Sequence, residues 1–139
     1  MLPLRYVRRW QFASAFLLIF VLASTLIPAV WLWPGSRDLS AWVIGVDKWL
    51  HGITFAILAV WFAGLYRPRS YWKIGVGLIL FGLFIEACQQ LVAYRSAELF
   101  DVAADIIGVV IGLLIAGAGL GGWSLRVEGW LVRRREELG

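Results

Sequence analysis

The stretch FASAFLLIFVLASTLIPAVWLW, residues 12–33, is uncharged over its whole length. A helix needs about 20 apolar residues to cross the hydrocarbon core of a bilayer, so this stretch predicts a transmembrane helix. Three further segments of similar length follow it, at residues 48–66, 73–94 and 102–123. We therefore expect an all-α fold: an integral membrane bundle of four transmembrane helices that makes up a single domain, residues 1–139. Pro28 is expected to kink or end the first helix.

The composition also favours a membrane protein. The 139 residues are 61% hydrophobic and 16% charged, with a mean hydropathy of +0.80. Soluble domains are about half apolar and about a quarter charged. The net charge of +4 comes from basic residues that flank the apolar segments, which favours contact with membrane lipids and argues against a nucleic-acid partner. The single cysteine, Cys88, allows no intrachain disulfide.

The basic residues lie mainly on one side of the predicted spans. The N-terminal arm, the connection between the second and third spans, and the C-terminal tail together carry ten of the 13 Lys and Arg residues. By the positive-inside rule, both termini are expected to be cytoplasmic. The basic tail, VRRREELG, is predicted to anchor the protein on the anionic inner leaflet. Cleavage of the first span as a signal peptide is the alternative, but the span is long and its apolar stretch continues into PAVWLW, where a signal peptide would have a small-residue cleavage site.

Polar side chains recur near the outer ends of the second, third and fourth spans. Within each span they are three or four residues apart, so they share one face of the helix. They are Asp47 and His51; Glu86, Gln89 and Gln90; and Asp101 and Asp105. A charge inside a membrane normally faces the bundle interior or a water-filled cavity, and it is paired. We therefore expect one polar cluster near the outer leaflet, with Lys48 and Arg95 balancing part of its negative charge.

Gly108 and Gly112 continue the line of Asp101 and Asp105 along the fourth span. A Gly-x-x-x-Gly pair lets another helix approach closely. The two glycines are therefore predicted to be packing residues, and the two acids are expected to point at a neighbouring helix, away from lipid.

Three motifs follow one another in this region: DKWLH at 47–51, EACQ at 86–89 and RSAELFDVAADIIGVVIG at 95–112. In this order and spacing they resemble the VanZ-like membrane proteins. The resemblance implies a multi-pass protein of the bacterial inner membrane and cell envelope. The family's namesake is linked to low-level resistance to the glycopeptide teicoplanin.

The resemblance also marks individual positions. They are Asp47, Lys48, His51, Glu86, Gln89, Arg95, Asp101, Gly108 and Gly112. Asp105 departs from the family pattern, because it stands where Asn is more usual. An amide donates and accepts hydrogen bonds, whereas an ionised carboxylate only accepts, so the hydrogen bonding at this position must differ.

Three interpretations of the cluster remain open. In the first it binds an envelope lipid, a lipid-linked envelope precursor or a lipoglycopeptide, and the ligand-binding residues are Asp47, Lys48, His51, Glu86, Gln89, Arg95, Asp101 and Asp105. In the second it is an acid–base or metal-dependent enzyme site, with His51, Glu86 and Asp101 as the catalytic candidates. In the third the cluster only holds the helices together.

The sequence gives fewer indications about cofactors and assembly. It contains one histidine and no dense metal-binding motif such as His-Glu-x-x-His, so no metal or cofactor is expected. Four helices are few for a transporter, and that function would require a homodimer, which is the oligomer we consider.

Overall fold

The computed structural model describes residues 1–26, 40–91 and 99–138, with side chains from residues 48 and 100 onward in the last two ranges. Its elements are α1 (Val7–Leu26), α3 (Ser40–Leu65), η1 (Pro68–Ser70), α4 (Tyr71–Gln90), α5 (Leu99–Ile115), the π-helical turn η2 (Ala116–Leu120) and α6 (Trp123–Glu136). Four helical segments are long and apolar enough to cross a membrane: Val7–Leu26, Lys48–Leu65, Pro68–Gln90 and Phe100–Leu120. The predicted all-α bundle with four spans is confirmed.

Some helix bounds differ from those predicted. Helix α1 begins at Val7 and not near residue 12, because residues 7–11 contain neither Gly nor Pro and Arg is a good helix former. Helix α3 begins at Ser40, well before the predicted start at residue 48. Pro28 and the predicted outer ends of the first and third spans lie outside the described residues.

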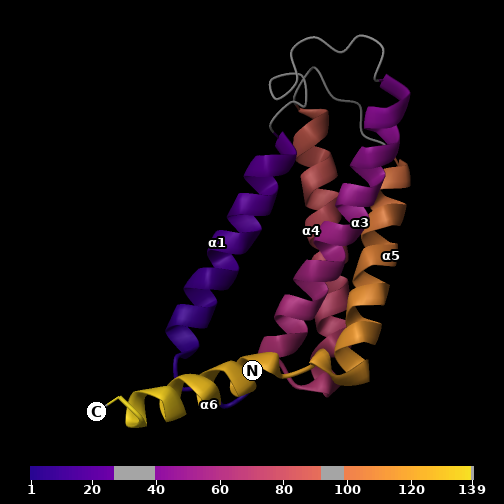
Figure 1. Cartoon of the computed structure of the whole chain (residues 1–139). Coiled ribbons are helices and arrows are strands. Elements are labelled where there is room, and N and C mark those ends of the chain that lie inside the picture. The colour runs from indigo at the N-terminus through magenta and orange to yellow at the C-terminus, as the bar shows by residue number, and fades with distance from the viewer. Residues whose placement is uncertain (27–39, 92–98, 139) are drawn as a thin grey trace.

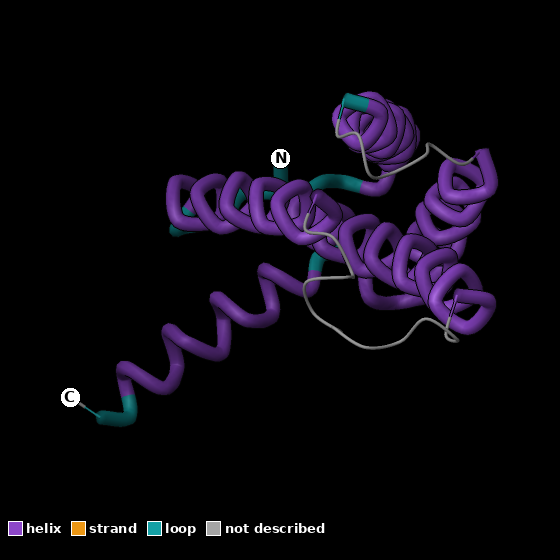
Figure 2. The backbone as a smooth tube through the Cα atoms, turned by 90° about the horizontal axis from the view of Figure 1, so that it is seen from above, coloured by secondary structure: helices purple, strands orange, loops and turns teal. Residues whose placement is uncertain are grey.

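Helices α3, α4 and α5 run side by side, and α1 leans away from them (Figure 1). Seen from above, α6 extends sideways from one end of this group (Figure 2). That end also holds the start of α1, the end of α3 and the start of α4. The basic arm, the basic connection at Arg67 and Arg69, and the basic α6 therefore share one end of the bundle.

The closest packing lies between α3 and α5. A Cβ atom added to Gly108 would overlap the carbonyl oxygen of Gly52, and one added to Gly112 would overlap that of Ala56 and lie 2.7 Å from the Cβ of Ala59. The two backbones are thus in contact along two turns of α5. Small residues that permit such contact are what drives helix association in lipid, where burial of apolar surface gives little gain.

Helix α1 has large apolar side chains that nothing in the described protein covers. Phe12 is 76% exposed, Phe16 70% and Ile19 65%. In water, a patch of this kind would be an aggregation hazard or an interface. On a membrane-spanning helix it is the surface that lipid tails contact.

The glycine-rich segment AGAGLGG, residues 116–122, ends α5 and turns the chain sideways into α6. Gly119 has φ 143° and Gly122 has φ 66°, conformations that side chains with a Cβ rarely adopt. The sequence predicted a fourth span to residue 123 and a basic tail without assigned structure. The structure instead ends the span at Leu120 and forms a separate 14-residue helix, α6.

Three tryptophans fix α6 to the bundle. The ring centroids of Trp10 and Trp123 are 5.3 Å apart, and those of Trp61 and Trp123 are also 5.3 Å apart. Gly64 leaves the space that the indole of Trp123 occupies, because a Cβ there would overlap the ring. The Ser124 hydroxyl donates a hydrogen bond to the Gly64 carbonyl beside it.

Glu128 joins α6 to the N-terminal arm. One carboxylate oxygen accepts a hydrogen bond from the Arg5 backbone N–H at 2.7 Å, and the other accepts from the Tyr6 N–H at 3.0 Å and from the Trp10 indole at 2.9 Å. Burial alone would raise the pKa of Glu128. The hydrogen bonds from Arg5, Trp10 and Tyr6, together with the Arg5 charge, outweigh burial and hold this pKa below its usual value.

This pKa predicts a pH dependence of stability. A carboxylate with a lower pKa in the folded state stabilises the fold fully above its unfolded-state pKa, and that contribution is lost as pH falls through the folded-state value. Thermal unfolding in detergent between pH 7 and pH 3 should show Glu128→Gln to be less stable than wild type at neutral pH, with the difference shrinking toward low pH. The exposed Glu137→Gln is the control and should follow wild type. A constant difference across this range would contradict the prediction.

Candidate functional site

The best-defined polar contact inside the bundle joins α3 to α5. The Nδ1 atom of His51 lies 3.1 Å from Oδ1 of Asp105, and the two side chains are 5% and 2% exposed. If Asp105 is ionised, its Oδ1 accepts the Nδ1–H of His51, which fixes the tautomer of a neutral ring. The pair lies one turn from the Gly52–Gly108 contact, so the close approach of the backbones brings the two side chains together.

The second carboxylate oxygen of Asp105 points at α4. A Cβ added to Gly82 would lie 2.6 Å from Oδ2 of Asp105 and 3.3 Å from the ring of Phe55. Gly82 therefore makes room for the carboxylate. Among the described residues Oδ2 has no hydrogen-bond partner, which is a costly state for a buried polar oxygen.

Glu86 and Asp101 lie one helical turn farther along the same interface. They are 5% and 3% exposed. Helices α4 and α5 are antiparallel, and Gly82 faces Asp105. Glu86 lies four residues after Gly82 on α4, and Asp101 lies four residues before Asp105 on α5. Because the helices are antiparallel, both steps lead in the same direction along the bundle, so Glu86 and Asp101 are at similar heights. We call His51, Glu86, Asp101 and Asp105 the acid–histidine cluster.

Lys48 lies at the edge of this cluster. Its Nζ atom is 5.5 Å from the centre of the Phe100 ring, one residue before Asp101 on the first turn of α5. Lys48, His51, Glu86 and Asp101 each take part in a further interaction, so none of the four is without a partner. The predicted site residues Arg95 and the side chain of Asp47 lie outside the described residues.

Gln89 does not face the cluster. Its side-chain amide donates a hydrogen bond at 3.0 Å to the carbonyl of Thr25 on α1, and it is 1% exposed. Gln90 is exposed. The polar stripe expected on the third span therefore divides: Glu86 faces α5, while Gln89 joins α4 to the otherwise loosely held α1.

The cluster offers several carboxylate acceptors and one imidazole in a buried setting. Within residues 1–26, 40–91 and 99–138, no three His, Cys, Asp or Glu side chains converge in a way that fits a metal ion. The groups present can accept hydrogen bonds from hydroxyl, amide or ammonium groups. A histidine oriented by a carboxylate can also act as a general base.

Sequence reasoning missed one residue beside the cluster, Gly82, and one packing partner away from it, Thr25. Gly82 has no side chain that could bind or react. The only indication in the sequence is its position one turn before Glu86 on α4, which puts both residues on the same face of the helix. Thr25 contributes through its backbone carbonyl, which no sequence pattern distinguishes from any other carbonyl.

The chain was compared with models of protein families. A family model described as VanZ/LLP1 matches residues 1–120, which include the four membrane spans and the whole acid–histidine cluster. Helix α6 lies beyond the matched residues. No curated protein and no solved structure matches the chain.

Proposed function

The chain belongs to the VanZ/LLP1 family, and we propose that it is a binding protein of the bacterial cell envelope, set in the inner membrane with both termini cytoplasmic. Its acid–histidine cluster would bind the polar end of an amphiphile, either a lipid-linked envelope precursor or a lipophilic glycopeptide. A role in resistance of the teicoplanin type follows from the second class of ligand.

One observation carries this proposal: four ionisable side chains from three helices are buried within membrane-spanning segments. Such groups are costly in a membrane and mark functional sites by default. Packing does not need them, because Gly52, Gly108 and Gly112 already bring α3 and α5 into contact. Neutral polar side chains would hold helices together at a lower desolvation cost than ionisable ones, as Gln89 does between α4 and α1.

The chemistry of the cluster indicates which groups it would recognise. Its carboxylates would accept hydrogen bonds from sugar hydroxyls, amides or an ammonium group. Lys48 at the edge would attract a phosphate or carboxylate. A headgroup in which sugar or amine donors lie next to a phosphate fits both features, and so does a glycopeptide with its many hydroxyl and amide groups.

Glu86→Gln tests the proposal. The amide replaces the buried carboxyl group with little change of shape, so we expect stability equal to or above that of wild type, because functional sites are often kept at a cost in stability. Affinity for a polyprenyl phosphate that carries a sugar or amino-sugar headgroup, or for teicoplanin, should fall by about tenfold, as for the loss of one charge-assisted hydrogen bond. Thermal unfolding and ligand titration in detergent measure the two effects.

The exposed Gln90→Ala on the same helix is the matched control and should leave both quantities unchanged. A loss of several kcal/mol of stability in Glu86→Gln, of the size seen when a buried charge pair is broken, would mean that the cluster is structural. Unchanged affinity for both probes would remove Glu86 from the binding site.

The His51–Asp105 contact favours a second candidate, an acid–base enzyme acting on the same class of lipid. A carboxylate at 3.1 Å from Nδ1 orients the imidazole as in known base–orienter pairs. Mass spectrometry of the lipid probe after incubation separates the candidates: an altered probe supports the enzyme, and a bound but unaltered probe supports the binding protein.

A further inference from the structure

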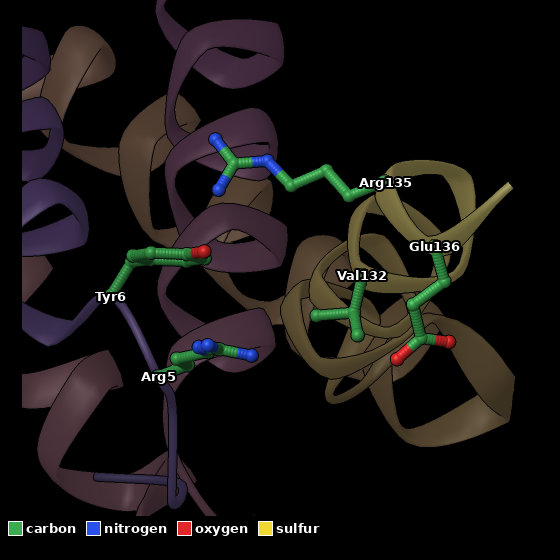
Figure 3. Close-up of a pocket in the computed structure, with 5 residues that line it drawn as sticks. All are labelled: Arg5, Tyr6, Val132, Arg135 and Glu136. Carbon is green, nitrogen blue, oxygen red and sulfur yellow. The ribbon is translucent and has the colours of Figure 1, made fainter. Parts of the chain in front are cut away.

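A pocket of about 220 Å³ lies between the N-terminal arm and the last turns of α6, at the opposite end of the bundle from the acid–histidine cluster. Its lining consists of Arg5, Tyr6, Val132, Arg135 and Glu136. Figure 3 shows the Arg135 side chain reaching from α6 toward the arm and the Arg5 side chain reaching from the arm toward α6. The VanZ/LLP1 match ends at residue 120, so one wall of this pocket lies outside the family region.

The two walls of the pocket are held in place. Glu128 accepts hydrogen bonds from the backbone of Arg5 and Tyr6, and it lies four residues before Val132 on the same face of α6. The carboxylate of Glu128 thus contacts the backbone of Arg5, and Arg5 is also one of the residues that line the pocket. The pocket exists before any ligand arrives, which lowers the entropic cost of binding.

The protein neutralises the charge in the pocket only in part: the single carboxylate of Glu136 lines it beside Arg5 and Arg135, and the charge of Arg5 also acts on Glu128. Within the described part of the chain, neither Arg5 nor Arg135 lies within ion-pair distance of a carboxylate. Arg9 adds a third positive charge, with its guanidinium 5.0 Å from the centre of the Tyr6 ring. Guanidinium groups bind phosphate through paired hydrogen bonds, and two of them line this pocket.

Helix α6 also has the pattern of a helix that lies in a membrane surface. Val127, Trp130 and Leu131 share one face by spacing, and they are 37%, 49% and 41% exposed. Arg133, Arg134 and Arg135 form its last turn. An exposed apolar face with Trp and with Arg beside it is typical of interfacial helices that bind anionic lipid. This apolar face argues for a lipid as the source of the phosphate.

We propose that Arg5 and Arg135 bind the phosphate of an anionic phospholipid, with the apolar face of α6 set among the acyl chains of the same leaflet. This site is separate from the proposed ligand site in the acid–histidine cluster and does not depend on it. It gives α6 a function that goes beyond anchoring by net charge: a defined headgroup site between two segments 130 residues apart in the sequence.

The test compares two double variants that each remove two positive charges from the same end of the bundle. Arg5→Gln/Arg135→Gln alters the pocket, and Arg67→Gln/Arg69→Gln alters the exposed connection between α3 and α4. Each protein is placed in nanodiscs of phosphatidylcholine alone or with phosphatidylglycerol, and bound phosphatidylglycerol is counted after extraction by native mass spectrometry. We expect retention of phosphatidylglycerol to fall by about tenfold in the pocket variant and to stay near wild type in the control.

Equal losses in both variants would overturn the proposal, because general attraction of charge would then account for the binding. Equal retention of phosphatidylcholine and phosphatidylglycerol by wild type would also overturn it. Displacement of the lipid by millimolar inorganic phosphate would show that a free anion is the ligand. Should the pocket variant unfold in phosphatidylcholine, Arg5→Lys/Arg135→Lys replaces it: we expect weaker retention than wild type, because Lys cannot form the paired contacts, and undiminished retention would count against the site.

Discussion

Gly108→Ala should cause one of the two strongest losses of stability in this protein. The added methyl group would overlap the carbonyl oxygen of Gly52 and approach the Gly52 Cα, and backbone atoms cannot rotate out of the way as a side chain can. Helices α3 and α5 must therefore separate. Forced overpacking costs about 1–3 kcal/mol and occasionally more, and we expect the upper end because the contact is backbone to backbone. Unfolding in mixed detergent micelles measures the loss.

Gly77→Ala is the matched control, since nothing lies within 4 Å of the Cβ that it would add on α4. Its stability should equal or exceed that of wild type, because Ala favours a helix more than Gly does. Similar stability in the two variants would show that α3 and α5 do not meet at Gly108. The Gly108 variant should also disturb the nearby His51–Asp105 pair, so its affinity for any cluster ligand should fall together with its stability.

The membrane spans could be predicted because their signal is local. Each is a run of about 20 apolar residues, and each run, read by itself, indicates one helix. Gly108 and Gly112 were predictable as packing residues for a similar reason, because their spacing in one helix is itself the pattern. Their partners on α3, Gly52 and Ala56, were not assigned, because the register between two helices depends on both surfaces together.

Gln89 shows where sequence reasoning stops. Its spacing from Glu86 puts both on one side of α4, but a difference of three residues is about 60° around a helix. That angle separates a side chain that faces α5 from one that faces α1. Periodicity predicts a polar face, whereas the position of the neighbouring helices decides which residue meets which partner.

Helix α6 was missed for another reason. Its 14 residues include four arginines and two acids, so it is too short and too charged to be predicted as a span. The contacts that hold it come from far away in the chain: Glu128 binds the arm at Arg5 and Tyr6, and Trp123 packs on Trp10. Contacts between segments so far apart in the chain produce no periodic pattern in the sequence of either segment.

His51→Ala should cause the second large loss, about 3 kcal/mol. The substitution removes the imidazole from Oδ1 of Asp105, whose Oδ2 already has no hydrogen-bond partner among the described residues. Removing one member of a buried pair leaves the other buried without compensation, which costs about 3–5 kcal/mol. We expect a loss at the lower end of this range, because a carboxylate without its partner can take up a proton and become neutral. Asp105→Ala should cost less, since an imidazole without this partner is less costly to bury than a carboxylate without one, and the methyl group adds no buried polar atom.

The double variant His51→Ala/Asp105→Ala distinguishes a coupled pair from two independent residues. If the contact at 3.1 Å couples them, the double variant should be more stable than the sum of the single losses implies, by about 1 kcal/mol or more. Additive losses would mean that each side chain acts through other neighbours. Coupling would also bear on function: a histidine that owes its orientation to Asp105 loses that orientation when a ligand draws the carboxylate away. The contact between His51 and Asp105 would then connect ligand binding on α5 to the position of the imidazole on α3.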